Sequence, residues 1–199
     1  QVHSALRMEA SLADVAGEEL MQRYRDGDAA AFDLLYARHK GGLYRYITRL
    51  VSERGIAEEV FQDVWMNLVR ARGSYTVQAK FSTFLYRMAH NRAIDYFRRR
   101  KEAQLARGDD DAEEDPLHTI AADPSVNPER QVSARQQSAR LLALIAQLPP
   151  AQREALLLRE EAGMSLDEIA QSTGVDRETA KSRLRYAVAK LERGMQGWW

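Results

Sequence analysis

The 199-residue sequence contains no cysteine. This absence excludes disulfide bonds, thiolate zinc sites and cysteine nucleophiles, and it fits a reducing cytoplasm. No apolar run approaches the roughly 20 residues that a membrane span needs, and no secretory signal peptide is visible. We therefore expect a cytoplasmic protein without direct membrane insertion. We also expect Met8 to be the native start, so that residues 1–7 would be an added segment.

The sequence also lacks the patterns of known catalytic sites. It has no paired carboxylates, glycine-rich phosphate loop, nucleophile elbow or metal-ligand spacing. His39 and His90 stand apart from other ligand types, and we expect them on the surface or facing a partner. The expectation is a protein that is not an enzyme, with no metal, no cofactor and no small-molecule substrate.

The formal net charge is zero, but the charge is unevenly distributed. Residues 1–107 carry 18 basic and 13 acidic side chains, residues 108–134 carry 1 and 8, and residues 135–199 carry 10 and 8. Binding to phosphates depends on local patches rather than on the sum. Two mildly basic parts joined by an acidic one are compatible with nucleic-acid binding.

The pattern is helical throughout, with no sustained period-two alternation. Apolar residues recur at three- and four-residue spacing in eight segments. The helices are predicted over about residues 18–25, 29–51, 56–72, 81–100, 127–147, 151–161, 166–173 and 177–195. The pair Gly41–Gly42 should weaken or kink the second of these.

Residues 108–126 have the composition of a flexible linker, because they are acidic, poor in apolar residues and contain two prolines. The sequence therefore predicts an all-α protein of two small helical domains. Residues 1–17 would form an N-terminal tail, 18–107 the first domain and 127–199 the second. Asn127 followed by Pro128 is a good start for the second domain's first helix.

The segment Phe81–Arg100 combines five aromatic and five arginine side chains. Aromatic rings stack on bases, and guanidinium groups pair with phosphates. Most of its apolar side chains recur at core spacing, so the arginines are the better DNA candidates. Bidentate phosphate contact favours Arg92, Arg98, Arg99 and Arg100.

A helix-turn-helix is predicted near the C-terminus. Ser165 and Glu168 form a capping box, Gly174 suits the tight turn, and Asp176 can cap the second helix. Buried positions between the helices are expected at Ile169, Ala170, Val175, Ala180, Leu184 and Val188. The outward positions, where a recognition helix reads base edges, are Arg177, Glu178, Lys181, Ser182 and Arg185.

Taken together, the chain resembles the extracytoplasmic-function sigma factors of bacterial RNA polymerase from roughly Glu18 to Arg193. Four segments carry the resemblance in the family's order. They are Asp28–His39, Ala57–Trp65, Phe81–Arg92 and Leu148–Arg183. The resemblance implies a transcription initiation factor that binds core polymerase, directs it to promoters and assists promoter melting. It also implies regulation by an anti-sigma factor.

The resemblance also assigns roles to individual residues. Polymerase binding, on the clamp of the largest subunit, would fall to Glu58, Glu59, Gln62, Asp63 and Trp65. The loop Tyr75–Lys80 and the helix after it would hold a base flipped out of the minus-ten element, with Asn91 as a base contact. The minus-ten set is Tyr75, Lys80, Asn91, Arg92, Arg98, Arg99 and Arg100. Tyr75 either packs beneath the loop or stacks on the base.

The outward residues of the recognition helix would read the minus-thirty-five element. Glu178–Ala180 and Tyr186 depart from the common family pattern, so the promoter sequence is not inferred. Arg153 and Arg159 either contact the DNA backbone or form salt bridges. The carboxylates of Asp109–Asp115 are expected to follow a basic path that RNA later uses in the polymerase.

Two other readings remain open from the sequence. A helix-turn-helix regulator acting without polymerase would explain residues 165–195, but it would leave the Phe81–Arg100 segment unexplained. An enzyme is the weaker reading, since no catalytic pattern supports it.

Overall fold

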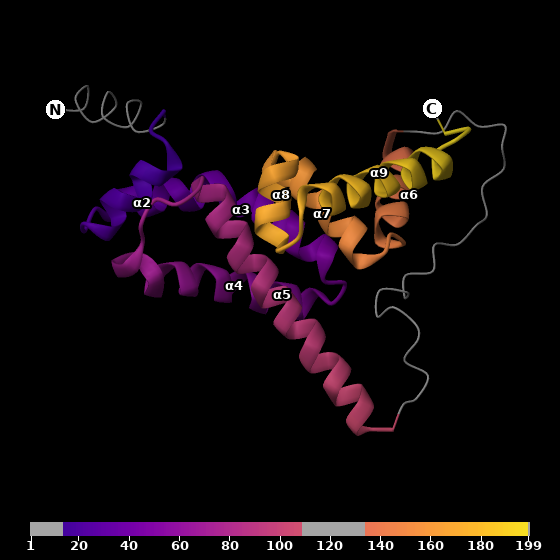
Figure 1. Cartoon of the computed structure of the whole chain (residues 1–199), viewed down its shortest axis with the longest axis horizontal. Helices are drawn as coiled ribbons and strands as arrows, with labels where there is room; N and C mark the ends of the chain where they lie inside the picture. The colour runs from indigo at the N-terminus through magenta and orange to yellow at the C-terminus, as the bar shows by residue number, and fades with distance from the viewer. Residues whose placement is uncertain (1–13, 109–133, 199) are drawn as a thin grey trace.

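The computed structural model describes residues 14–108 and 134–198. The described parts consist of α-helices and one short 3-10 helix, without a strand (Figure 1). The elements are α2 (Gly17–Arg25), α3 (Ala29–Leu50), α4 (Arg54–Ala71), η1 (Arg72–Ser74), α5 (Phe81–Ala106), α6 (Ala134–Ala146), α7 (Pro150–Ala162), α8 (Leu166–Thr173) and α9 (Arg177–Gly194). The all-α prediction is confirmed. The predicted linker and the helix start at Asn127 lie outside the described residues.

Local sequence explains where most helices begin and end. The Asp28 side chain accepts a hydrogen bond from the Ala30 amide at the start of α3. Proline occupies the first position of α7, where its missing N–H has no intrahelical acceptor to lose. Gly163 and Gly174 end α7 and α8 with φ of 62° and 69°, in the left-handed region that favours glycine. Except at the end of α5, the helix boundaries within the described residues were therefore predictable to within a few residues.

Helix α5 is longer than predicted and its last turns project away from the rest of the molecule (Figure 1). No proline or glycine interrupts the chain between Phe81 and Gly108, where φ is 73°. The apolar pattern fades after Arg100, but good helix formers continue. The fading pattern therefore marked the edge of the packed body rather than the end of the helix.

Helices α2 to α5 form the N-terminal domain around a continuous core. Its fully buried side chains include Leu35, Tyr46, Leu68, Leu85 and Tyr86. Removing a leucine-sized side chain from water stabilises the fold by about 1.5–3 kcal/mol. The predicted core of α5 is only partly confirmed. Phe81, Leu85 and Ala89 are buried and Phe84 and Met88 half-buried, whereas Ile94 is exposed.

Helices α6 to α9 form the C-terminal domain, which packs against the N-terminal domain rather than standing apart. Leu148, Leu156 and Ala187 form a small core of their own. Other side chains of α7 and α8, including Leu158 and Ile169, join the N-terminal core. In Figure 1, α7 and α8 lie against α3 and α5.

The predicted weakness at Gly41–Gly42 does not interrupt α3, which is helical from Ala29 to Leu50. A Cβ atom at Gly42 would lie 2.9 Å from the Tyr86 hydroxyl and 3.1 Å from the Glu161 carbonyl oxygen. Gly42 therefore provides the space for a close approach between helices of the two domains.

Candidate nucleic-acid interface

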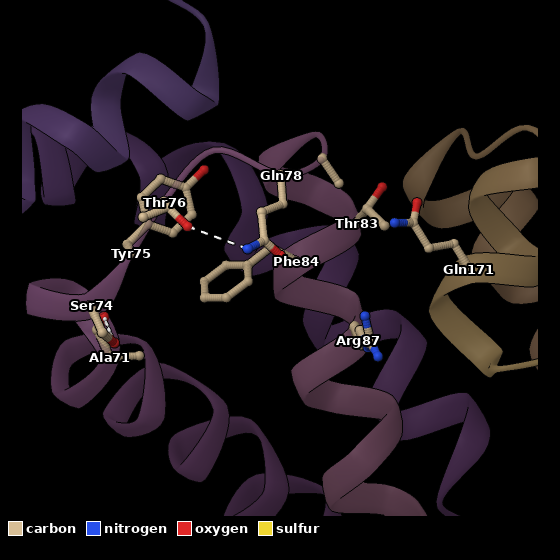
Figure 2. A pocket seen from close by; sticks show the side chains of 10 residues that line it. Ala71, Ser74, Tyr75, Thr76, Gln78, Thr83, Phe84, Arg87 and Gln171 are labelled. Carbon is tan, nitrogen blue, oxygen red and sulfur yellow. Dashed lines mark hydrogen bonds between the residues drawn. The ribbon is translucent and has the colours of Figure 1, made fainter.

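A pocket of about 200 Å³ lies between the loop that follows η1 and the first turns of α5 (Figure 2). Its lining is Ala71, Ser74, Tyr75, Thr76, Gln78, Ala79, Thr83, Phe84, Arg87 and Gln171. The Tyr75 and Phe84 rings meet edge to face with centroids 5.1 Å apart. The Tyr75 hydroxyl and the Thr83 Oγ1 are buried without a hydrogen-bond partner. Both atoms have almost no exposed surface, so the accessible polar lining is provided by exposed side chains such as Thr76 and Gln78. An aromatic wall beside such polar side chains suits a flat ring that carries polar groups.

Helix α2 holds this loop in place. Arg25 Nη1 donates to the Tyr75 carbonyl at 3.2 Å. The Glu18 carboxylate accepts from the Phe81 amide at 2.6 Å, which satisfies one of the free N–H groups at the start of α5. Burial, followed by the nearby charge of Glu18, raises the pKa of Tyr75.

In this structure Tyr75 is packed beneath the loop. Its side chain is only 4% exposed, so it supports the loop from beneath and forms part of the pocket wall. It cannot offer an exposed stacking face in this arrangement.

The predicted DNA-contacting side chains of α5 fall into two groups. Asn91 and Arg99 are exposed. Arg92 instead donates to Asp63 at 2.6 Å and lies 3.7 Å from Glu59, so it ties α5 to α4. Arg92 is therefore not an open phosphate site in this structure.

The remaining two arginines of the predicted row are also engaged. Arg98 pairs with Asp95 at 3.3 Å, one turn before it on α5. Arg100 pairs with Glu53 at 2.5 Å, near the start of α4. Exposed pairs of this kind contribute little energy, so both guanidinium groups can exchange these partners for phosphates.

The acidic face of α4 is where the sequence placed it. Glu58, Glu59 and Gln62 are exposed and Asp63 is half-buried beneath Arg92. Trp65, which was assigned to the same binding set, is only 6% exposed. The expectation that Trp65 forms a surface contact is therefore wrong, because its side chain packs in the core.

Trp65 is buried because α4 turns its indole toward α3. The ring centroid lies 4.9 Å from that of Tyr36 and 6.1 Å from that of Phe32. Its neighbour Phe61 on α4 completes the cluster at 6.3 Å. Position in the sequence alone did not distinguish this face from the acidic one.

The helix-turn-helix forms as predicted. Ser165 accepts from the Glu168 amide at 3.2 Å, and the Glu168 side chain accepts from the Ser165 amide at 2.8 Å. Asp176 accepts from the Thr179 amide at 2.6 Å and so caps α9. This hydrogen bond lowers the pKa of Asp176.

The outward face of α9 carries the predicted reading side chains. Arg177, Glu178, Lys181 and Arg185 are exposed, whereas Ser182 is half-buried. All four exposed side chains are already paired or stacked. Arg177 pairs with Asp167 at 3.2 Å, Lys181 lies 3.7 Å from Glu178, and Arg185 stacks on the Tyr186 ring at 5.0 Å. Of the predicted buried positions Val188 was wrong, because it is 38% exposed on the outer side of α9.

Arg153 is structural, whereas Arg159 is exposed and makes a local contact. Arg153 is fully buried and donates to the carbonyls of Ile145, Ala146 and Leu148. Arg159 donates to the Met164 carbonyl at 2.7 Å. The sequence signal was present, since Leu148–Pro149–Pro150 ends a helix and leaves carbonyls that need donors.

The two domains also share polar contacts that the sequence did not reveal. Lys80 pairs with Glu168 at 2.8 Å. The hydrogen bond from Lys80, with that from the Ser165 amide, lowers the pKa of Glu168. His90, expected on the surface or facing a partner, is half-buried 2.6 Å from the Glu154 carboxylate. Gln171 of α8 lines the pocket and points toward Thr83 (Figure 2).

Neither a membrane nor a metal site is indicated in residues 14–108 and 134–198. No helix there has the length and apolar character to cross a membrane. No cluster of three or more His, Asp or Glu side chains in those ranges is arranged to hold a metal ion.

Two family models match the chain. The model of sigma-70 region 2 matches residues 35–103, and that of sigma-70, region 4 matches residues 138–191. The chain is 30% identical to RNA polymerase sigma factor CarQ of Myxococcus xanthus over 172 residues, which are 86% of this chain and 92% of that protein. It is 31% identical to ECF RNA polymerase sigma factor SigM of Mycobacterium tuberculosis over 178 residues, 88% and 82% of the two chains.

Two solved structures share the fold. One is CnrH in complex with the cytosolic domain of CnrY, with a TM-score of 0.65, 22% identity and coverage of 92% of this chain and 98% of that one. The other is the sigma factor RpoE in complex with the anti-sigma factor NepR from Bartonella quintana, with a TM-score of 0.62, 20% identity and coverage of 83% and 96%.

Proposed function

Because the chain belongs to the sigma-70 family of RNA polymerase sigma factors, in its extracytoplasmic-function group, we propose how its surfaces divide the work of initiation. Sigma factors of this group bind core polymerase, direct it to promoters and help to open them. The N-terminal domain, residues 18–107, carries polymerase binding and minus-ten capture. The C-terminal domain, residues 127–199, reads the minus-thirty-five element. Both act in the cytoplasm and neither performs catalysis.

The acidic face of α4 is the proposed polymerase contact. Glu58, Glu59 and Gln62 present a charged, exposed surface, with Asp63 at its edge. Such a face orients and accelerates association with a basic partner more than it adds affinity. Arg92 already donates a hydrogen bond to Asp63, so a cationic side chain of the polymerase would compete with Arg92 for this carboxylate.

The pocket beside α5 is the proposed site for an unstacked minus-ten base. The observation that carries this proposal is the pocket itself, whose lining combines the Tyr75 and Phe84 rings with polar side chains such as Thr76 and Gln78. Single strands are recognised when a base leaves the stack, enters such a pocket and is hydrogen-bonded along its edge. Asn91, exposed on the same helix, supplies a further base contact, and Lys80 and Arg98–Arg100 neutralise phosphates.

The exposed face of α9 is the proposed reader of the duplex. Arg and Lys pair with guanine in the major groove, and a glutamate accepts from cytosine. Arg177, Glu178, Lys181 and Arg185 provide these groups on consecutive turns, and Ser182 lies between them. Arg153 is fully buried and is left out of this set.

Run-off transcription with core polymerase on a promoter library tests this assignment. We expect initiation with the wild-type protein and a changed base preference at one minus-ten position for Thr76→Val, which keeps the shape but removes an exposed hydroxyl of the pocket lining. Ser82→Ala, on α5 and outside the pocket lining, is the control and should keep the preference. An unchanged preference in Thr76→Val would remove the pocket from the proposal. Asn91→Ala tests the Asn91 base contact in the same way.

A regulator that binds DNA without polymerase is the rejected alternative. It does not account for the match to sigma-70 region 2 over residues 35–103. If the immobilised protein did not retain core polymerase, the alternative of a regulator without polymerase would be favoured again. We further propose that an anti-sigma factor controls the protein, which co-purification from cells would test. The role of the acidic residues Asp109–Asp115 lies outside the described residues and stays a prediction.

A further inference from the structure

Tyr186 is a large aromatic side chain that lies exposed on the recognition helix. It is 52% exposed, and it follows Arg185 directly in the middle of α9. The side of α9 that faces its own domain buries small side chains instead, at Ala180 and Ala187. Packing within the domain therefore does not account for the Tyr186 ring.

The contact that the Tyr186 ring does make is with Arg185. The guanidinium carbon Cζ of Arg185 lies 5.0 Å from the ring centroid. A guanidinium group is attracted by the negative face of an aromatic ring. Because the group is planar and carries its N–H donors at its edge, a stacked arginine keeps these donors available for another partner. Tyr186 therefore holds the charge of Arg185 without using its hydrogen bonds.

The other two cations of this face are held differently. Arg177 pairs with Asp167 at 3.2 Å, and Lys181 lies 3.7 Å from Glu178. Both have a carboxylate partner with which DNA must compete. In the part of the chain that the structure describes, no carboxylate pairs with Arg185. Arg185 is therefore the cation of this face whose donors are already free.

The position of Arg185 along α9 makes its orientation important. It follows Arg177 by about two helical turns, which is about 12 Å along the helix axis. The major groove is about 12 Å wide, and a recognition helix contacts base edges mainly with its N-terminal residues. Arg185 would therefore lie near the edge of the groove, within reach of both bases and phosphates. An arginine that moves freely there pairs with phosphates in any sequence, whereas one held in a fixed direction can select a base.

We propose that Tyr186 is a positioning residue for minus-thirty-five recognition. Its ring holds the Arg185 guanidinium with the donor edge toward the groove, so that Arg185 reads one guanine through O6 and N7 instead of pairing with phosphates. Holding the side chain before binding also reduces the conformational freedom that is lost in the complex. This inference rests on the proposed function of α9 and adds to it how one of its side chains obtains specificity.

Run-off transcription with core polymerase, on a promoter library randomised in the minus-thirty-five element, tests the proposal. Arg185→Met should lose the preference for guanine at one position, which identifies the base that Arg185 reads. Tyr186→Leu, which removes the ring but retains a good helix former, should reduce the preference at that same position on the order of fivefold. Tyr186→Phe keeps the ring and should keep the preference. Val188→Ala, at another exposed apolar position of α9, is the control and should match wild type.

Two further measurements separate positioning from a general structural effect. The double variant Arg185→Met with Tyr186→Leu should show the same preference as Arg185→Met alone, because the ring acts through the guanidinium. In the NMR spectrum of the free protein, the ring should shift the Arg185 side-chain protons upfield in wild type and Tyr186→Phe, and this shift should vanish in Tyr186→Leu. A variant that is only less stable would show a lower midpoint in circular dichroism melting and would lower transcription from all promoters alike.

An unchanged guanine preference in Tyr186→Leu would overturn the proposal, and so would an equal loss in Tyr186→Phe. A further loss when Tyr186→Leu is added to Arg185→Met would show that the tyrosine contacts DNA itself. If Arg185→Met weakened all promoters uniformly and lowered the salt dependence, Arg185 would be a phosphate contact, and the proposal would again be wrong. In each of these cases Lys181→Met would still change a preference. Failure of the proposed function is recognisable separately, because no variant at Arg177, Lys181 or Arg185 would then change the preference at any minus-thirty-five position.

Discussion

Replacement of the buried Arg153 tests how the C-terminal domain is held together. Its guanidinium donates to the carbonyls of Ile145, Ala146 and Leu148 at 3.0, 2.5 and 2.6 Å. These carbonyls lie at the end of α6 and in the turn before α7, where the helix dipole places partial negative charge. Arg153 therefore joins two helices of the domain that carries the recognition helix.

The expected loss follows from the acceptors left behind by Arg153→Met. The Ile145 carbonyl also accepts from the Leu148 amide at 3.1 Å, so it keeps one partner. The other two carbonyls lose their guanidinium donor, at about 1–3 kcal/mol each. Methionine retains much of the packing and removes the cost of burying a cation, which offsets part of this loss. We expect a net destabilisation of about 2–4 kcal/mol.

Urea denaturation followed by tryptophan fluorescence measures this loss. The chain has three tryptophans, and a Trp65→Phe background leaves the two C-terminal ones as reporters. With a urea dependence of about 2 kcal/mol per molar, the midpoint should fall by about 1–2 M. The urea midpoint of Arg153→Lys should lie between those of wild type and Arg153→Met, because one ammonium group cannot reproduce the forked donors of a guanidinium. Arg135→Met, at an exposed position of α6, should match wild type. A shift below about 0.5 M for Arg153→Met, or a lysine variant as stable as wild type, would refute the reasoning.

Three further predictions concern the helix-turn-helix and the domain contact. Ser165→Ala removes the capping box and should cost about 1 kcal/mol, seen as a lower thermal midpoint. The lowered pKa of Glu168 means that its stabilising contribution is present above the unfolded pKa of about 4.3 and is lost as the pH falls through the lower folded value. Energy transfer between dyes attached to the two domains should therefore drop on acidification below about pH 4. An NMR titration of Lys80→Met should show a higher Glu168 pKa, and an unchanged pKa would contradict the role of the Lys80–Glu168 pair. Lys181→Met should weaken duplex binding by about 1–2 kcal/mol in anisotropy titrations, whereas Lys190→Met, exposed elsewhere on α9, should not.

Local chemistry was sufficient for the helix boundaries and for the recognition helix. The capping box at Ser165, the cap at Asp176 and the left-handed glycines at 163 and 174 act within a few residues of where they stand. Such interactions are the same in any tertiary context, so the sequence alone reports them. The exposed face of α9 followed from the same periodicity.

The sequence was a weaker guide to which side chains are buried or already paired. The resemblance assigned Trp65 to the same polymerase-binding set as the acidic residues of α4, whereas the structure packs its indole against Tyr36 and Phe32. Arginine chemistry suggested Arg92 as a phosphate contact, although Asp63 on α4 pairs with it. The sequence does not show whether an apolar side chain packs in the core or contacts a partner, or whether a charged side chain forms an ion pair or binds a ligand. The neighbouring residues from other helices decide between these roles, and only the tertiary structure shows them.

The sequence by itself determined the helices, their caps, the recognition helix and, through the order of its motifs, the family. The tertiary structure alone decided the relation between the two domains. Gly42 was visible only as a weak point in a helix until the Glu161 carbonyl was found beside it. Glu154 was one acidic residue among many until Tyr46, 108 positions earlier, was found to donate to it. Contacts over such separations are selected by the packing of whole helices, which no local rule encodes.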